Sequence, residues 1–109
     1  MQGIIIFITA ADKKEAKKIA GILLKNRLVA CANLIKDIES YFWWQGKKQK
    51  AKECLIVVKT KKTLLNKVIK LVSSIHSYEC PEIIAVPVIG GHRPYMDWIE
   101  KETYGRSYP

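Results

Sequence analysis

Three cysteines and two histidines are the residues of this chain best suited to redox chemistry or metal binding. Cys31, Cys54 and Cys80 are odd in number and form no C-x-x-C pair, which argues against both a disulfide framework and a zinc finger. Cys31 and Cys54 lie in apolar runs and are expected to be buried thiols, whereas Cys80 precedes Pro81 in a loop and should be the most accessible. His76 follows a helical apolar stripe, so it either contacts the last carbonyls of that helix or serves as a ligand.

The sequence lacks the motifs of the common enzyme classes. It has no G-x-S-x-G, no glycine-rich phosphate loop and no H-E-x-x-H, and no nucleophile has an evident base partner. The apolar run 54–58 also offers no aromatic ring of the kind that an RNA-recognition domain uses for stacking. We therefore expect neither an enzyme nor an RNA-recognition domain.

Length and composition limit the remaining possibilities. The 109 residues are enough for one domain, which we place at 1–109. No apolar run approaches the ~20 residues of a membrane span, and the N-terminus does not resemble a signal peptide, so we expect a cytoplasmic protein with no membrane partner. The net charge of +9 favours acidic partners, but lysine-rich helix faces are also ordinary solubilising surface.

Four consecutive aromatic residues at 41–44 form the most unusual stretch of the chain. They precede Gly46, and long apolar or β-branched runs lie on both sides, at 28–38 and 54–60. This pattern predicts a long β-hairpin with its turn within 45–50.

The aromatic residues of this hairpin must divide between its two faces. Phe42 and Trp44 share one face and Tyr41 and Trp43 the other, because successive side chains of a strand point in opposite directions. One small domain rarely covers both faces of a projecting ribbon, so we expect these four residues at an oligomer interface. No Lys or Arg lies among them along the chain, so we expect no nucleic-acid partner.

Hydrophobic periodicity predicts the order strand, helix, strand, strand, helix, strand, followed by a short helix. The expected elements are a strand at 3–9, a helix from Asp12 to about Asn26, a strand at 28–44 broken at 36–37, a return strand at 52–60, a helix capped within 60–63 with an apolar stripe from Leu64 to Ile75, an edge strand at 82–88 that contains Pro87, and a helix opened by Pro94. This order indicates an α+β, ferredoxin-like split βαβ sandwich (βαββαβ) with a long hairpin and an extra C-terminal helix. Both main helices should cover one face of the sheet, with the first and third strands in its centre. The tail at 104–109 has no periodic signal.

Five segments, in this order and spacing, resemble the CutA family, which is named for divalent-cation tolerance. They are 27–34 (RLVACANL), 41–47 (YFWWQGK), 59–60 (KT), 76–83 (HSYECPEI) and 95–98 (YMDW). The resemblance implies a ferredoxin-like subunit in a tight homotrimer whose long hairpins pair across subunits. It also implies a cytoplasmic protein described in terms of metal tolerance and copper binding, with no established reaction.

The resemblance also indicates where a metal would bind. Some family members resemble copper binders through a Cys near the end of the first strand and two adjacent histidines before a Tyr-x-x-Pro-Glu segment. The corresponding positions here hold Ile8, Ile75 and His76. His76 needs at least two more donors to bind Cu²⁺ or another divalent cation, and we assign no other cofactor. Folding or a neighbouring subunit would have to supply them from Glu79, Cys80, Glu82 and His92.

Two functions fit these expectations. In the first, the protein is a non-enzymatic homotrimer that acts in divalent-cation (copper) tolerance. In the alternative, it is a trimeric signalling or adaptor module, similar to the PII regulators, whose clefts between subunits bind a small ligand or a partner protein. Lys59, Tyr78 and Glu82 are expected to line such a cleft, near His76.

Overall fold

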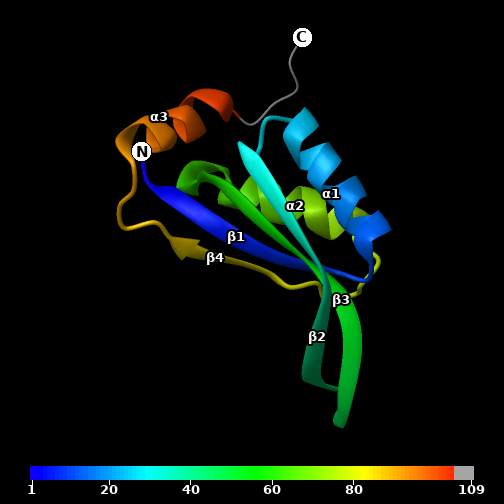
Figure 1. Ribbon diagram of the computed structural model, residues 1–109. Coiled ribbons are helices and arrows are strands. Elements are labelled where there is room, and N and C mark those ends of the chain that lie inside the picture. Colours follow the sequence, from blue (N-terminus) through cyan, green and yellow to red (C-terminus); the bar gives the residue numbers. More distant parts are fainter. Residues whose placement is uncertain (105–109) are drawn as a thin grey trace.

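The computed structural model describes residues 1–104, which form an antiparallel sheet of four strands with helices packed against it (Figure 1). The elements are β1 (Gly3–Ala10), α1 (Lys13–Lys25), β2 (Cys31–Trp44), β3 (Lys47–Lys61), a 3₁₀ turn (Lys62–Leu64), α2 (Leu65–Ile75), β4 (Ile83–Pro87) and α3 (Arg93–Glu102). The strand order β2-β3-β1-β4 places β1 and β3 in the centre and β4 at an edge, as predicted. The α+β class is confirmed, and residues 105–109 of the expected irregular tail lie outside the described residues.

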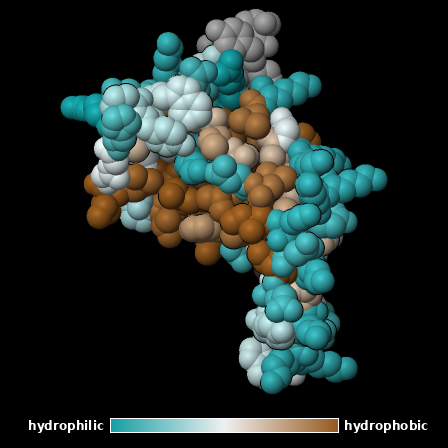
Figure 2. All heavy atoms as spheres, in the orientation of Figure 1, coloured by the Kyte–Doolittle hydropathy of each residue, from teal (hydrophilic) through white to brown (hydrophobic). Residues whose placement is uncertain are grey.

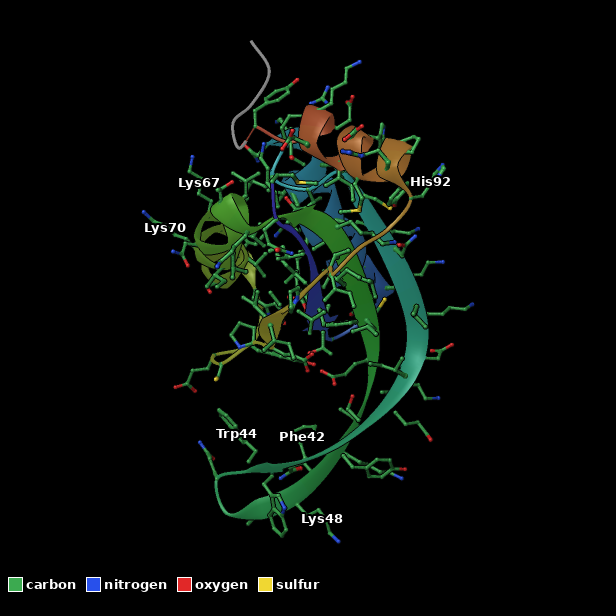
Figure 3. All side chains as sticks on the ribbon, turned by 90° about the vertical axis from the view of Figure 1, so that its left-hand side faces the viewer. Phe42, Trp44, Lys48, Lys67, Lys70 and His92 are labelled. Atoms are coloured by element: carbon green, nitrogen blue, oxygen red, sulfur yellow. The ribbon has the colours of Figure 1, made fainter. Side chains whose placement is uncertain are left out.

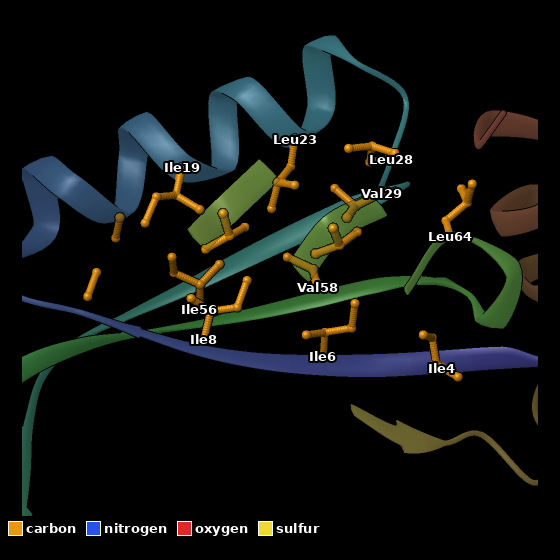
Figure 4. Packing of buried hydrophobic residues seen from close by; sticks show 14 of the residues in the cluster. Ile4, Ile6, Ile8, Ile19, Leu23, Leu28, Val29, Ile56, Val58 and Leu64 are labelled. Atoms are coloured by element: carbon orange, nitrogen blue, oxygen red, sulfur yellow. The ribbon is translucent and has the colours of Figure 1, made fainter. Parts of the chain in front are cut away.

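The hydrophobic core lies between the sheet and helices α1 and α2 (Figure 4). Alternate side chains of a strand share a face, so β1 contributes Ile4, Ile6 and Ile8 to this side. Each large aliphatic side chain buried here stabilises the fold by roughly 1.5–3 kcal/mol. The neighbouring elements add Ile19, Leu23, Ile56, Val58, Val68 and Val72, all fully buried. Leu24 is 43% exposed because it lies about 100° around the helix from the buried Leu23.

The predicted cap of the first helix is confirmed, whereas the second helical segment begins after Lys61, within the predicted range, without the predicted side-chain cap. Asp12 caps α1, where its Oδ1 accepts a hydrogen bond from the Glu15 N–H at 2.8 Å. Thr60 caps no helix, because it belongs to β3 and its buried hydroxyl donates to the Leu28 carbonyl at 2.6 Å. Leu64 occupies the N-cap position of α2 and makes no side-chain capping bond.

The hairpin is longer and its turn tighter than predicted. Gln45 and Gly46 form a two-residue turn with φ of 51° and 78°, and pairing begins at once between Trp44 and Lys47. The return strand therefore starts at Lys47 instead of near residue 52, since backbone pairing continues through a stretch without apolar alternation. The expected break at 36–37 is confirmed as a register shift between Ile35 and Ile38.

The Asp12 cap gives a direct test of this helix start. Asp12→Ala should lower the free energy of unfolding by about 1 kcal/mol, because the Glu15 N–H loses its acceptor. Urea denaturation followed by circular dichroism measures the change. Lys14→Ala, an exposed substitution in the first turn of α1, is the control and should change the free energy by less than about 0.5 kcal/mol. Equal losses in both variants would show that the cap contributes nothing.

Candidate functional site

The sheet face opposite α1 and α2 is apolar and largely uncovered, and we call it the open face. The ladder places Phe7 beside Val57 and Ile84, and Ile5 beside Val86. Ile84 is 56% exposed and Ile35 is 50% exposed. Figure 2 shows a broad apolar surface on the body of the molecule, in the orientation of Figure 1. The open face consists of Ile5, Phe7, Ile35, Leu55, Val57, Ile84 and Val86.

The hairpin continues the open face with two of its four aromatic residues. Beyond the bulge, the register pairs Phe42 with Gln49 and Trp44 with Lys47, on the same side of β3 as Leu55. Figure 3 shows Phe42 and Trp44 on the inner side of the curved hairpin and Lys48 on the outer side. The predicted division of the aromatic residues is therefore confirmed, and one pair extends the uncovered apolar surface.

The side chain of His76 is fully buried and both of its ring nitrogens are hydrogen bonded. The Tyr78 N–H donates to Nδ1 at 3.0 Å, so Nε2 carries the proton and donates to the Thr9 carbonyl at 2.7 Å. The ring thus binds a carbonyl of β1, although the sequence suggested the last carbonyls of α2. Neither nitrogen has a free lone pair for a metal in this arrangement.

The candidate metal donors do not converge within one chain. The part of the chain that the structure describes contains no group of three or more His, Cys, Asp or Glu side chains able to hold a metal ion. Glu79 and Cys80 are exposed in the loop after α2. His92 precedes α3, whose Met96 packs against Gly3, about 20 Å along β1 from the Thr9 carbonyl that binds His76. One chain therefore does not fit a metal ion at His76.

The three cysteines lie largely where the sequence placed them. Cys54 is buried, and this burial raises the pKa of its thiol. Cys31, which we expected to be buried, is only half-buried on β2, and Cys80 is exposed in its loop. All three are free thiols, as expected.

The residues expected in a cleft separate into two places. Tyr78 donates a hydrogen bond to Glu53 Oε2 at 2.7 Å, and Glu82 lies close enough to Glu53 for the two charges to interact. Lys59 instead contacts the Asn33 side chain and pairs with Ile5. The expectation that Lys59 lies near His76 in one chain is therefore wrong, because about 13 Å of β1 separates them.

Glu53 is the site residue that the sequence did not reveal. It is only 7% exposed although it is a carboxylate. Loss of solvent raises the pKa of Glu82, and the charge of Glu53 raises it further. Loss of solvent also raises the pKa of Tyr78, followed by its hydrogen bond to Glu53. The one available signal was that Glu53 is the single acid in the lysine-rich run 47–61.

Glu15 joins the start of α1 to the loop that follows α2. Its carboxylate accepts hydrogen bonds from the Ala11 N–H at 2.9 Å, the Ser77 N–H at 2.7 Å and the Ser77 hydroxyl at 2.9 Å. Burial alone would raise the pKa of Glu15, but these three hydrogen bonds hold the pKa below its ordinary value. The loop that carries His76 and Tyr78 is thereby fixed against the end of the sheet.

Comparison with known proteins identifies the family of this fold. The model of the CutA1 divalent ion tolerance protein family matches residues 4–102. The chain belongs to the CutA1 divalent ion tolerance protein family. The divalent-cation tolerance protein CutA of Archaeoglobus fulgidus is 41% identical over 96 residues, which cover 88% of this chain and 93% of that relative. The crystal structure of CutA1 from Oryza sativa superposes with a TM-score of 0.93 at 36% identity and covers 95% of each chain.

The CutA relatives differ in length and in the location that their names give. The chain spans 56% of the Oryza sativa protein, which is named chloroplastic and is 37% identical over 92% of this chain. The solved structure from Archaeoglobus fulgidus is described as a periplasmic CutA, with a TM-score of 0.89 at 39% identity and coverage of 92% of this chain and 97% of that one. Among the described residues, no helix combines the length and apolar character needed to cross a membrane.

The Glu15 contacts predict how stability depends on pH. The folded-state pKa of Glu15 lies below the unfolded value near 4.5, so its stabilisation is fully present above that value and disappears as the pH falls through the folded pKa. Glu15→Gln should lower the free energy of unfolding by about 1–3 kcal/mol at pH 7 and make the acid side of the pH profile flatter. Denaturation from pH 7 to 3 measures both effects. Glu79→Gln changes an exposed carboxylate nearby and serves as the control; a Glu15→Gln profile parallel to that of the unmodified protein would contradict the assignment.

Proposed function

We propose that this protein is a non-enzymatic homotrimer that acts in divalent-cation tolerance. Membership of the CutA1 family supports the tolerance role. The main evidence for the assembly is the open face, because an apolar surface of this kind on a folded domain is typical of an interface. Covering it removes apolar area from water at about 25 cal/mol per Å². The resemblance to CutA proteins implies that two further copies provide the cover.

The inner aromatic pair of the hairpin supports the same assembly. Phe42 and Trp44 project beyond the body of their own domain and are 41% and 42% exposed. Because they continue the open face, a neighbouring subunit that covers this face can also cover both rings. Tyr41 and Trp43 lie on the opposite side of the hairpin, so they are the less favourable half of the predicted interface.

We infer that any Cu²⁺ site of this protein uses donors from more than one subunit. The described part of one chain offers no three-donor group, and the ring of His76 is fully hydrogen bonded. The exposed Cys80 thiol and Glu79 carboxylate can reach outward to a neighbouring chain. A soft thiolate is a preferred ligand of copper, particularly of its reduced form.

A trimeric adaptor that binds a small ligand or a partner protein remains the second candidate. Lys59 lies at one end of the exposed side of the sheet, and Glu53, Tyr78 and Glu82 lie at the other. Only neighbouring subunits can bring these two groups into one cleft. A thermal-shift screen of small anions against the unmodified protein and Lys59→Ala discriminates the two functions, because the adaptor requires a ligand whose effect Lys59→Ala removes.

Location in the cytoplasm also stays a prediction, since the names of the relatives include other compartments.

The two sides of the hairpin should respond differently to loss of a ring. Trp44→Ala should lower the melting temperature by several degrees and make it depend more strongly on protein concentration, because the inner ring is lost from the interface. Trp43→Ala removes an outer ring of the same size and is the matched control. Scanning calorimetry at two concentrations about a hundredfold apart measures both variants. If Trp43→Ala lowered the melting temperature more than Trp44→Ala does, the interface would lie on the outer side of the hairpin, contrary to the proposal.

Copper titration tests where the donors lie. Cys80→Ser should weaken Cu²⁺ binding at least about tenfold by calorimetry, because the shared site loses its soft ligand. His76→Ala should leave the affinity of the folded protein unchanged but lower the free energy of unfolding by about 1–3 kcal/mol, because the Thr9 carbonyl and the Tyr78 N–H lose their partner. Loss of copper binding in a folded His76→Ala protein, with Cys80→Ser unaffected, would reverse the assignment.

A further inference from the structure

Aromatic and basic side chains alternate across the outer side of the hairpin. The ladder places Lys50 opposite Tyr41 and Lys48 opposite Trp43. Directly opposed residues of an antiparallel pair have Cβ atoms about 4.5–5.5 Å apart, so each ring has an ammonium group within reach. Tyr41 is 65% exposed and Trp43 is 73% exposed, and both lysines are exposed as well. We call these four residues the outer face of the hairpin.

We propose that the outer face binds single-stranded nucleic acid. Exposed rings provide stacking surfaces for bases of any sequence, and lysines beside them provide contacts for the phosphates. No basic residue lies among the aromatic residues along the chain, so the sequence alone does not predict such a partner. The strand register supplies these residues from the other strand, where sequence neighbours do not reveal them.

The outer face is independent of the surface assigned to assembly. Phe42 and Trp44 lie on the inner side of the hairpin, and Lys48 points away from them (Figure 3). An assembly formed through the open face and the inner rings does not require Tyr41, Trp43 or their lysines. The proposal does not depend on whether the protein acts in cation tolerance.

The charge of the surroundings favours a polyanion. The chain carries +9, and the next pair along the ladder adds Lys52 opposite Glu39. Glu39 offsets Lys52, so Lys48 and Lys50 are the cations that remain for phosphates. An anionic membrane is the less suitable partner, because the outer face has no aliphatic side chain to enter the boundary of the acyl chains.

Fluorescence anisotropy with a labelled oligothymidylate of about 20 nucleotides tests the proposal on the full-length protein. Trp43→Ala should weaken binding about tenfold, and Trp43→Phe, which keeps a ring, should restore most of the affinity. Lys48→Glu with Lys50→Glu should weaken binding more than tenfold. If both lysines contact phosphates, the slope of log K against log salt should also decrease by about 1.4.

The control carries the same charge change at a distant place. Lys67→Glu with Lys70→Glu alters two exposed lysines of α2 and should change the affinity less than about threefold. Sedimentation and circular dichroism confirm that each variant keeps the fold and the assembly of the unmodified protein. Equal weakening by the α2 pair, or unchanged binding by Trp43→Ala, would show diffuse charge attraction and overturn the proposal. Absence of oligonucleotide binding also overturns it, and binding to phosphatidylserine vesicles through Trp43 would then assign the outer face to a membrane.

Discussion

Both faces of the central strands are apolar; α1 and α2 cover one of them, whereas α3 covers only the end of the other near Gly3. The alternation along β1 sends Ile4, Ile6 and Ile8 into the core and leaves Ile5 and Phe7 on the open face. A continuous apolar run of this kind is typical of a strand covered on both sides. The proposed assembly and the clefts expected between its subunits depend on what covers the second side.

The polar groups of the site stabilise one end of this sheet. Glu15 binds the loop after α2, and His76 in that loop binds the Thr9 carbonyl near the end of β1. Both ring nitrogens of His76 are thereby used in hydrogen bonds, whereas a metal ligand needs a nitrogen with a free lone pair. Any metal site of this protein would therefore have to use other groups, such as Glu79 and Cys80, which are exposed in the loop after α2.

The fold was predictable because its signals are local. The apolar alternation of β1, the Asp12 cap and the break at 36–37 each follow from neighbouring residues, and together they imply the sheet order. The start of β3 was not predictable, because residues 47–52 have no apolar pattern and are held in the strand by pairing with β2. The role of Thr60 was also not predictable from its neighbours, since its hydroxyl donates to the carbonyl of Leu28, more than thirty residues away in sequence.

The candidate site was less predictable than the fold, because its residues meet only across strands. Nothing along the chain indicates that Tyr78 binds Glu53, or that both nitrogens of His76 are occupied. The same limit hid the lysines that face Tyr41 and Trp43. The residue types indicated which side chains could bind or react, but the strand register and the packing decide which of these side chains are accessible.

Sedimentation equilibrium of the unmodified chain at micromolar concentration shows directly whether other copies of the chain cover the open face. If sister chains cover the open face in the trimer that the CutA resemblance implies, the mass should be three times the 12.5 kDa of one chain, or 37.5 kDa, and should not change with dilution. Val57→Glu, which places a charge in the middle of the open face, should shift the mass toward 12.5 kDa. A stable mass of 12.5 kDa for the unmodified protein would contradict the account, since the open face would then be exposed to water.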